Sequence, residues 1–367
     1  MNESAPVGYG VLPDFLRSCN TSRYAEVKVI MIPEAIGKLI EGNNLSEAEM
    51  EGVMNQIMDG QASPAQIGSF ITALRIKGET VEEITAAARV MREKAIKIET
   101  NSAMVVDTCG TGGDGANTFN ISTTAAFIVA GAGVTVAKHG NRSVSSNCGS
   151  ADVLKALGVN IEADVGTVER CLDQNGIGFL FAPMLHGAMK YAIGPRREIG
   201  IRTIFNMLGP LTNPAGADAQ LIGIYSGDLT EKIAAVLQKL GTKHALVVHG
   251  DDGLDEISLV SKTKVSELKD KEVNTYYIQP EDFNMRSCHA EDLRGGSPEE
   301  NARITLRVLE GEKGPKRDIV LLNAAASILA GGRAETFVEG IQVASESIDS
   351  GSAKKRLDGL VKTSNNQ

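Results

Sequence analysis

The chain has 367 residues, of which 42% are hydrophobic and 23% charged, a composition typical of a globular protein. This length suffices for two domains with a sizeable core, so intrinsic disorder and a small disulfide-stabilised fold are excluded. The chain has 37 basic and 46 acidic residues and a net charge of −9, which argues against non-specific binding to nucleic acid or to an anionic membrane. Glycine is abundant, with 39 residues, which favours loops where the backbone approaches a ligand.

The cysteines and the apolar runs indicate the compartment. Five cysteines are widely spaced and include no CxxC pair, so neither a disulfide framework nor a zinc site is expected. A reducing, cytoplasmic location is therefore expected. No basic segment followed by an apolar one marks a secretory signal, and the longest apolar run, residues 121–137, is too short and too polar to cross a membrane.

The N-terminal third of the chain is typical of helices. Residues 1–30 have no sustained period, and we expect a poorly ordered extension there. A helical domain is expected over residues 31–97, and residues 166–208, again largely helical, are expected to pack on it. Gly78 is expected to end one of these helices. Three capping boxes support the helices: Ser46 with Glu49, Ser63 with Gln66, and Thr80 with Glu83.

Strand and helix patterns alternate after Asn101. The predicted elements, in chain order, are a strand at Met104–Val106, a helix from near Ser122, a strand at Val134–Ala137, a helix at Ala151–Leu157, a strand at Leu221–Tyr225, a helix at Glu231–Leu240 and a strand at Ala245–Val248. Two or three helices are expected over residues 300–362. This alternation predicts an α/β domain over residues 98–362, with a mostly parallel sheet.

A glycine-rich loop follows the first predicted strand. Four of the six residues Gly110–Gly115 are glycine, and successive amides in such a loop can form a nest for phosphate oxygens. The spacing matches neither GxGxxG nor a Walker A loop. A structural turn is the alternative interpretation, but a helix cap needs only one polar residue and four lead into the next helix: Thr118, Asn120, Ser122 and Thr123.

A second polar loop, residues 138–146, follows the strand Val134–Ala137. Lys138 and Arg142 supply positive charge, and Gly140 allows close approach of the backbone. Serine hydroxyls complete a mixture suited to a polyphosphate: Ser143, Ser145 and Ser146. A solvated basic loop is the alternative, but the loop lies at the carboxyl end of an apolar strand, where open α/β sheets bind ligands.

Two further clusters carry charge. The acids of Gly250–Glu256 would repel one another unless a cation lies between them, and magnesium bound to a phosphate substrate would serve. A surface acidic loop remains the alternative, above all for Asp251 and Asp252. Near Pro195, which is expected to break a helix, one arginine could hold a substrate carboxylate, while the others pair with Glu198 or coat a helix: Arg196, Arg197 and Arg202.

Neither a nucleophilic triad nor a pair of histidines at metal-binding spacing occurs in the sequence. The chemistry indicated is therefore the positioning and electrostatic stabilisation of a phosphorylated substrate, assisted by a metal ion.

Several motifs together resemble the anthranilate phosphoribosyltransferase family: DTCGTGGDG, TFNIST, KHGNRSVSS, GSADVLKALG and RREIGIRTIFNMLGPLTNPA. The resemblance runs from about Met31 to near the C-terminus. It implies a small N-terminal helical domain beside a larger α/β domain, the nucleoside phosphorylase class-II type of fold. It also implies a magnesium-dependent, homodimeric enzyme of tryptophan biosynthesis. Such an enzyme joins anthranilate to 5-phosphoribosyl 1-diphosphate (PRPP) and releases pyrophosphate.

The resemblance also implies the roles of individual residues. PRPP would contact the two loops and a nearby serine: Gly110, Gly113, Asp114, Thr118, Asn120, Ser122, Thr123, Lys138, His139, Gly140, Asn141, Arg142, Ser143, Ser145, Ser146 and Ser150. Anthranilate would contact Gly110, His139, Asn141 and Arg196, and magnesium would be served by Ser122, Asp255 and Glu256. Gly187 departs from the pattern, because the family usually has proline after the histidine at position 186, and the first 30 residues have no family counterpart.

Two alternatives share this fold. Pyrimidine nucleoside phosphorylases use a different lysine-rich phosphate motif, and KHGNRSVSS and Arg196 speak against them. Non-catalytic nucleic-acid-binding relatives would be favoured by a basic surface, whereas this chain is acidic and retains its substrate loops.

Overall fold

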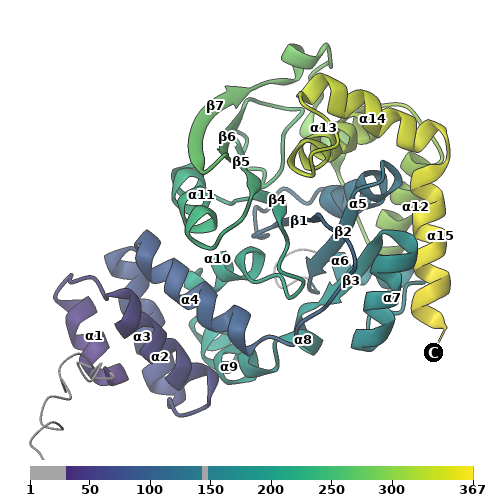
Figure 1. Ribbon diagram of the computed structural model, residues 1–367. Helices are drawn as coiled ribbons and strands as arrows, with labels where there is room; N and C mark the ends of the chain where they lie inside the picture. Colours follow the sequence, from purple (N-terminus) through teal and green to yellow (C-terminus); the bar gives the residue numbers. More distant parts are fainter. Residues whose placement is uncertain (1–29, 143–147, 367) are drawn as a thin grey trace, which may run out of the picture.

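The computed structural model describes residues 30–142 and 148–366 (Figure 1). The extension expected over residues 1–30 lies outside the described residues, except for Ile30. The same holds for three serines predicted in the second loop: Ser143, Ser145 and Ser146. Ile30 itself is buried in the core of the helical domain.

Four helices form the N-terminal domain: α1 (Ile32–Ile40), α2 (Glu47–Met58), α3 (Pro64–Lys77) and α4 (Val81–Lys94). The three predicted capping boxes are confirmed, because the N-cap and N3 side chains at the starts of α2, α3 and α4 bond reciprocally to backbone amides. Gly78 ends α3 as predicted, with a φ of 88° that glycine adopts without strain.

Two later helices complete this domain. Helices α9 (Lys190–Ile199) and α10 (Ile204–Leu211) pack on α2, α3 and α4, and their buried side chains join the same hydrophobic cluster. Residues 166–208 were expected to pack on the helical domain. Helices α9 and α10 lie against it, whereas α7 (Val165–Asn175) packs on strand β3 (Ile177–Phe181) and on α15 (Ser352–Asn365). The segment is largely helical, as expected, and it also contains a strand that was not predicted from the sequence, β3. A short apolar run buried on both faces has no period that separates strand from helix.

A seven-stranded sheet forms the centre of the larger domain, in the order β3-β2-β1-β4-β5-β6-β7. Its other strands are β1 (Val105–Gly110), β2 (Thr135–Gly140), β4 (Ala219–Gly223), β5 (His244–Gly250), β6 (Thr263–Lys269) and β7 (Glu272–Ile278). The neighbouring pairs β3–β2, β2–β1, β1–β4 and β4–β5 are all parallel, which confirms the predicted mostly parallel sheet. The four predicted strands, β1, β2, β4 and β5, lie within it. The antiparallel hairpin β6–β7 was not predicted from the sequence.

Helices cover both faces of the sheet (Figure 1). One face packs on α5 (Ile121–Gly131) and α13 (Pro315–Ala330), and the other packs on α7 and α11 (Thr230–Lys239). The remaining helices are α6 (Ser150–Ala156), α8 (Ala182–Leu185), α12 (Pro298–Leu309), α14 (Phe337–Asp349) and α15 (Ser352–Asn365), with short 3-10 turns η1 (Gly187–Met189), η2 (Gly227–Leu229), η3 (Pro280–Phe283) and η4 (Ala290–Leu293).

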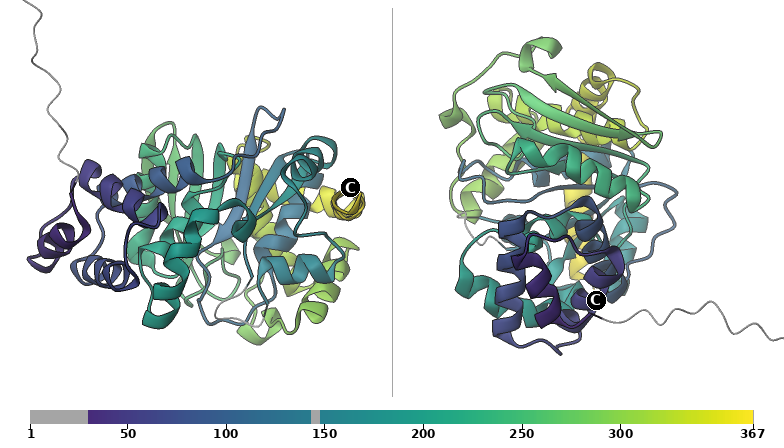
Figure 2. Two further views of the ribbon diagram at one scale, coloured as in Figure 1. Left: turned by 90° about the horizontal axis from the view of Figure 1, so that it is seen from below. Right: turned by 90° about the vertical axis from the view of Figure 1, so that its left-hand side faces the viewer.

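The C-terminal segment contains four helices, α12 to α15, so the expectation of two or three is wrong. The boundary between α14 and α15 is short: Ser350 ends one helix and Gly351, with a φ of 74°, precedes the next. Figure 2 shows the helical domain and α15 at opposite ends of the molecule. Among the described residues, the longest apolar helices fall short of what a membrane crossing requires.

Strands β1 and β2 separate towards their carboxyl ends. Their pairing covers only Val105 with Thr135 and Val106 with Val136, whereas β1 pairs with β4 as far as Gly110. From β1 the strand order runs to β2 and β3 on one side and to β4 and β5 on the other. Such a switch point opens a crevice at the carboxyl edge of the sheet, where α/β proteins bind ligands.

Candidate active site

The glycine-rich loop begins at the end of β1 and lies at this crevice. Gly112, Gly113 and Gly115 have φ values of 68°, 75° and 76°, in the left-handed region that favours glycine. A side chain at Gly110 would lie 2.5 Å from the Asp255 carboxylate. The Gly112 amide donates a hydrogen bond of 2.7 Å to that same carboxylate. The loop therefore already presents an amide to an anionic group.

The polar residues after this loop lie around the start of α5. The Ser122 amide donates to Glu256 Oε1 at 3.1 Å, so the helix N-terminus faces an acid. Asn120 bonds through its side chain to the Cys148 carbonyl and to Asn301, at 3.1 and 3.0 Å. Thr118 forms an isolated bridge with Arg294, and Thr123 is buried in the first turn of the helix. Ser122 is thus the residue of this group that lies nearest the acidic pair.

The second loop begins at the end of β2, across the crevice. Lys138 is 3% exposed, and its Nζ donates to the Thr108 carbonyl at 2.6 Å and to Ser122 Oγ at 3.5 Å. A side chain at Gly140 would collide with Ser150 Oγ at 2.2 Å, so only glycine fits there. The structure therefore brings Lys138 and Gly140 together with residues of the first loop and with Ser150.

The next two residues of this loop are exposed. The Asn141 carbonyl accepts a hydrogen bond of 3.2 Å from Ser150 Oγ. Arg142 forms an ion pair of 3.3 Å with Asp152 and lies over the Phe181 ring at 5.7 Å. The backbone at Asn141 is thus tied to the start of α6, while the Arg142 guanidinium lies at the surface.

Asp255 and Glu256 follow β5 and face the glycine loop. Burial, the charge of Glu256 and the charge of Asp114 hold the pKa of Asp255 well above its usual range. Burial raises the pKa of Glu256 to about 7, against the opposing effect of Lys138. Asp255 thus lies beside two other acids, Glu256 and Asp114, and Lys138 offsets the charge of Glu256. A cation would relieve the remaining repulsion.

This donor set fits magnesium bound to a phosphate. Carboxylate and hydroxyl oxygens are ligands that magnesium prefers, and it usually retains water or substrate oxygens as well. Among the described residues, no group of three acidic, histidine or cysteine side chains forms a complete metal site. Asp255, Glu256 and Ser122 would therefore hold the ion jointly with oxygens of a substrate.

The other acids of this segment have structural roles. Asp252 accepts hydrogen bonds of 2.9 and 3.0 Å from Ser258 and Ser261, and Asp251 is exposed. The alternative interpretation as a surface loop thus fits these two residues.

Arg196 lies on α9. The predicted helix break at Pro195 is wrong, because Pro195 is buried inside α9, where contacts with α2 and α3 offset its missing hydrogen bond. The Arg196 guanidinium lies over the Phe205 ring at 5.0 Å and forms no ion pair within the described part of the chain. Burial lowers the pKa of this guanidinium. A half-buried cation without a carboxylate partner is suited to a substrate carboxylate.

The two arginines that were alternatives to Arg196 lie in different settings. Arg197 is exposed. Arg202 donates to the Gly113 carbonyl and lies over the Tyr225 ring at 4.3 Å, so it is already attached to the glycine loop.

Two buried histidines lie between the domains. The rings of His139 and His186 are 5.1 Å apart. Burial lowers the pKa of His139 to about 3 and that of His186 to about 4, so both rings are neutral. His139 Nδ1 lies 3.2 Å from the Gly209 carbonyl, and neither Nε2 atom has a hydrogen-bond partner among the described residues. Both Nε2 atoms are thus buried polar atoms that the described residues leave unsatisfied.

Two groups at this site have no role predicted from the sequence. Asp107 lies on β1 and accepts a hydrogen bond of 3.1 Å from the His139 amide. Tyr225 packs against Arg202, and its amide donates to Thr111 Oγ1 at 3.1 Å. An acid within an apolar strand was the available signal for Asp107, whereas only the fold brings Tyr225 to the loop.

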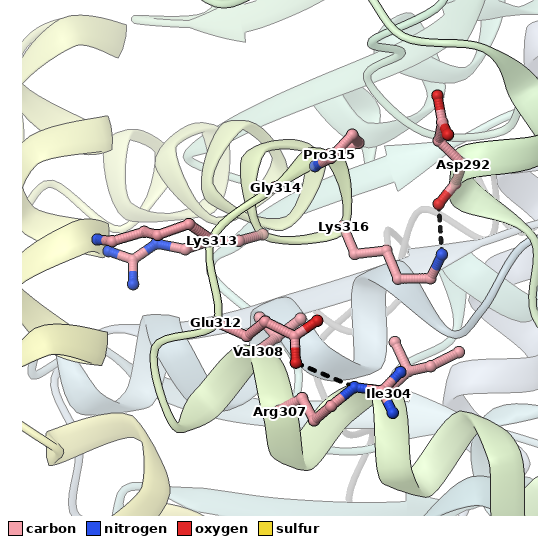
Figure 3. Close-up of a pocket in the computed structure, with 10 residues that line it drawn as sticks. Asp292, Ile304, Arg307, Val308, Glu312, Lys313, Gly314, Pro315 and Lys316 are labelled. Carbon is pink, nitrogen blue, oxygen red and sulfur yellow. Dashed lines mark hydrogen bonds and ion pairs between the residues drawn. The ribbon is translucent and has the colours of Figure 1, made fainter.

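A separate pocket lies between α12 and α13 (Figure 3). Its basic side chains already have partners: Arg307 pairs with Glu312 at 3.1 Å, Arg317 pairs with Asp349 at 2.8 Å, and Lys316 donates to the Asp292 carbonyl. Because these cations are already engaged, the loops of the crevice remain the candidate active site.

Comparisons with known proteins agree with this architecture. The family model described as "Glycosyl transferase family, helical bundle domain" matches residues 33–95, and "Glycosyl transferase family, a/b domain" matches residues 102–354. The anthranilate phosphoribosyltransferase of Geotalea uraniireducens is 57% identical over 349 residues, covering 91% of this chain and 100% of that protein. That of Symbiobacterium thermophilum is 60% identical over 323 residues, covering 88% and 95%.

Solved structures give the same result. The crystal structure of anthranilate phosphoribosyltransferase from Thermus thermophilus has a TM-score of 0.86 and 43% identity, and the match covers 90% of this chain and 99% of that one. The Saccharomyces cerevisiae enzyme, in complex with PRPP and Mg, has a TM-score of 0.85 and 29% identity, with 92% and 98% covered. The chain therefore belongs to the glycosyl transferase family that combines a helical bundle with an α/β domain, and within it to the anthranilate phosphoribosyltransferases.

Proposed function

We propose that the crevice between β1 and β2 binds PRPP with magnesium and that anthranilate binds beside Arg196 on α9. The activity of the family is the transfer of the phosphoribosyl group of PRPP to the amine of anthranilate, in tryptophan biosynthesis. One observation carries the assignment of the crevice: two loops rich in glycine and polar groups meet beside the acids Asp114, Asp255 and Glu256, which outnumber the buried Lys138. A magnesium–diphosphate complex supplies both the cation and the anion that these groups require.

On the PRPP side, the amides of the glycine loop and the Lys138 ammonium would bind phosphate oxygens. The proposed set is Gly110, Gly113, Asp114, Thr118, Asn120, Ser122, Thr123, Lys138, His139, Gly140, Asn141, Arg142 and Ser150, together with the serines outside the described residues. Bound magnesium would supply stabilisation of the negative charge that develops on the leaving pyrophosphate. Lys138 would support the same charge from the opposite wall of the crevice.

On the anthranilate side, Arg196 would bind the carboxylate, with Gly110, His139 and Asn141 nearby. An aromatic amine is neutral at pH 7, so it attacks the ribose C1 without prior removal of a proton by a strong base. The neutral rings of His139 and His186 leave Nε2 as an acceptor for an amine N–H. Holding the amine in line with the departing pyrophosphate would supply most of the rate enhancement.

A homodimer, a cytoplasmic location and the absence of a nucleic-acid partner are parts of the same proposal. Large apolar side chains are exposed on the helical domain, which supports pairing of two copies there: Met31, Ile40 and Ile76 are 59%, 74% and 82% exposed. Three cysteines, Cys109, Cys171 and Cys288, are free thiols, which supports a reducing compartment. The net charge of −9 argues against a nucleic-acid partner.

The experiment measures the loss of anthranilate fluorescence when PRPP and magnesium are added, for the wild type and for arginine variants. Arg196→Ala should raise the KM for anthranilate about ten- to hundredfold, because a charge-assisted hydrogen bond is worth roughly 1.5–3 kcal/mol. The KM for PRPP should change much less. Arg196→Lys should recover part of the loss, since a point charge lacks the bidentate fork.

The matched control is Arg197→Ala, which removes an exposed arginine from the adjacent position and should leave both KM values unchanged. Equal losses for both substrates in Arg196→Ala would assign this residue a structural role. An unchanged KM for anthranilate would remove it from the site, and a wild type without turnover would refute the proposed function.

A further inference from the structure

Side chains replace the backbone ladder where β1 and β2 separate. Beyond Val106 and Val136 the two strands share no ladder pairs. Instead, the Asp107 carboxylate on β1 accepts a hydrogen bond of 3.1 Å from the His139 amide on β2. In the other direction, Lys138 on β2 donates at 2.6 Å to the Thr108 carbonyl on β1. The width of the crevice therefore depends on two reciprocal contacts between a side chain and the backbone.

Packing alone does not account for an acid at position 107. Asp107 is 0% exposed, and its neighbours Val105 and Val106 on the strand are apolar. An apolar residue would avoid the cost of burying a carboxyl group. Burial raises the pKa of Asp107, and the charge of Lys138 acts in the opposite direction. The fold thus places a costly group beside the two residues that begin the second loop.

The backbone after His139 is held as a unit. The Asn141 carbonyl accepts from the Ala151 amide and from Ser150 Oγ, each at 3.2 Å. Gly140 lies so close to Ser150 and Phe179 that a Cβ would be 2.2 and 2.8 Å from their side chains. A shift at His139 is therefore passed on to Gly140 and Asn141 rather than absorbed between them.

We propose that Asp107 is a positioning residue for phosphoribosyl transfer: through the His139 amide and Lys138 it sets the distance between the two walls of the crevice. It does not contact the substrates. The proposal rests on the proposed function, because the residues it positions, Lys138, His139 and Asn141, are those assigned to PRPP and anthranilate. A displacement of these groups weakens the contacts that would hold bound PRPP, so the loss should appear chiefly as a higher KM.

The test compares Asp107→Ala and Asp107→Asn with a matched control, Asp218→Ala. Asp218 accepts a hydrogen bond of 3.0 Å from the Val105 amide, at the opposite end of the same strand and away from the crevice. Asp107→Ala should lower kcat/KM for PRPP about ten- to hundredfold, chiefly through a higher KM. Asp107→Asn retains an oxygen that accepts from the His139 amide and should stay within about fivefold of wild type. Asp218→Ala should lower the melting temperature and leave both KM values unchanged.

A purely structural role for Asp107 predicts a different result, in which kcat falls with the folded fraction and KM stays constant. That pattern would overturn the proposal, as would an equal rise of KM in Asp218→Ala. If Asp107→Ala does not fold, Asp107→Ser takes its place: a raised KM for PRPP in that variant supports the proposal, and a wild-type KM overturns it. Calorimetric binding of PRPP with magnesium separates the two proposals. If the wild type binds PRPP without turnover, only the proposed function fails, and the variants are then compared by their Kd for PRPP.

Discussion

The molecule has two clusters of charged side chains, one in the helical domain and one at the crevice. They differ in whether their positive and negative charges cancel. In the helical domain, Lys77 and Glu83 are 5% and 0% exposed and form an ion pair of 2.7 Å. Glu83 also accepts hydrogen bonds from the amides of Leu45 and Thr80, at 2.9 and 2.8 Å. One positive charge meets one negative charge there, and both carboxylate oxygens are satisfied.

The crevice has no such balance. Asp255, Glu256 and Asp114 repel one another, and the buried Lys138 offsets the charge of Glu256. The pKa of Asp255 is held well above its usual range, first by burial and then by these neighbouring charges. Burial also lowers the pKa of Lys138.

The difference separates a structural pair from a binding site. A saturated pair gains nothing from a further ion, whereas an unbalanced set of acids is stabilised when a cation binds. Perturbed pKa values at a cleft indicate function with most force where the local charges do not cancel. The comparison predicts that removing charge has opposite effects on stability in the two regions.

The largest expected effect is on turnover, from the double variant Asp255→Ala with Glu256→Ala. Turnover should fall about a thousandfold at a fixed magnesium concentration, because metal stabilisation of the leaving group is worth several kcal/mol. In the absence of magnesium and PRPP the variant should melt at the wild-type temperature or above, since two repelling acids are gone. Kinetics across a magnesium titration and calorimetry of the unliganded protein measure the two effects.

Asp252→Ala is the control for this variant, because Asp252 lies in the same segment but is exposed and bonded to serines. It should leave the magnesium dependence unchanged. Normal turnover of the double variant across the whole titration would show that these acids do not serve the metal.

The second effect is on stability, from Glu83→Gln in the helical domain. This change leaves the buried Lys77 ammonium without its counter-charge, which typically costs about 3–5 kcal/mol. The variant should unfold at lower denaturant concentration, while the KM values of its folded fraction stay at those of the wild type. A double-mutant cycle with Lys77→Met should show recovery of part of the loss. If the free energy of unfolding of Glu83→Gln lies within about 1 kcal/mol of the wild type, the Lys77–Glu83 pair is not a stabilising structural pair.

The helical domain and the parallel strands were predictable because their signals are local. A capping box lies within four residues, and Ser63 with Gln66 defines the start of α3 from the sequence alone. The hairpin β6–β7 was missed because its turn uses Asp270 and Lys271, with φ values of 51° and 63°, in place of the usual Asn-Gly. Pro195 was misread because tertiary contacts keep α9 helical through a proline.

The two loops that form the candidate site could be predicted from the sequence, but the contacts between their residues could not. Polar segments after apolar strands indicated both walls of the crevice, because parallel strands end at one edge of the sheet. The sequence could not indicate that Asp255 accepts from Gly112, since 143 positions separate them. It also could not indicate that Asp107 supports His139, because this contact depends on where β1 and β2 stop pairing.

The smallest effect concerns His186, which lies between the two regions and ends α8. Burial lowers its pKa in the folded protein to about 4, whereas an unfolded histidine titrates near 6.5. Between these values the unfolded chain binds a proton that the folded chain does not bind, so stability is lost as the pH falls from about 6.5 towards 4. Between pH 7.5 and pH 5, this residue should account for about 2 kcal/mol of lost stability.

His186→Gln removes this titration, so its free energy of unfolding should fall by about 2 kcal/mol less than that of the wild type between pH 7.5 and pH 5. Denaturant unfolding at both pH values measures the difference. The carboxyl groups of the crevice remain in both proteins, so their contribution cancels in the comparison. His186→Asn controls for the change of side-chain shape, because asparagine is also neutral. It should lose the same amount of stability as His186→Gln between pH 7.5 and pH 5, even if its free energy of unfolding at pH 7.5 is different. Equal pH dependence in the wild type and both variants would mean that His186 accepts a proton in the folded protein as readily as in the unfolded one.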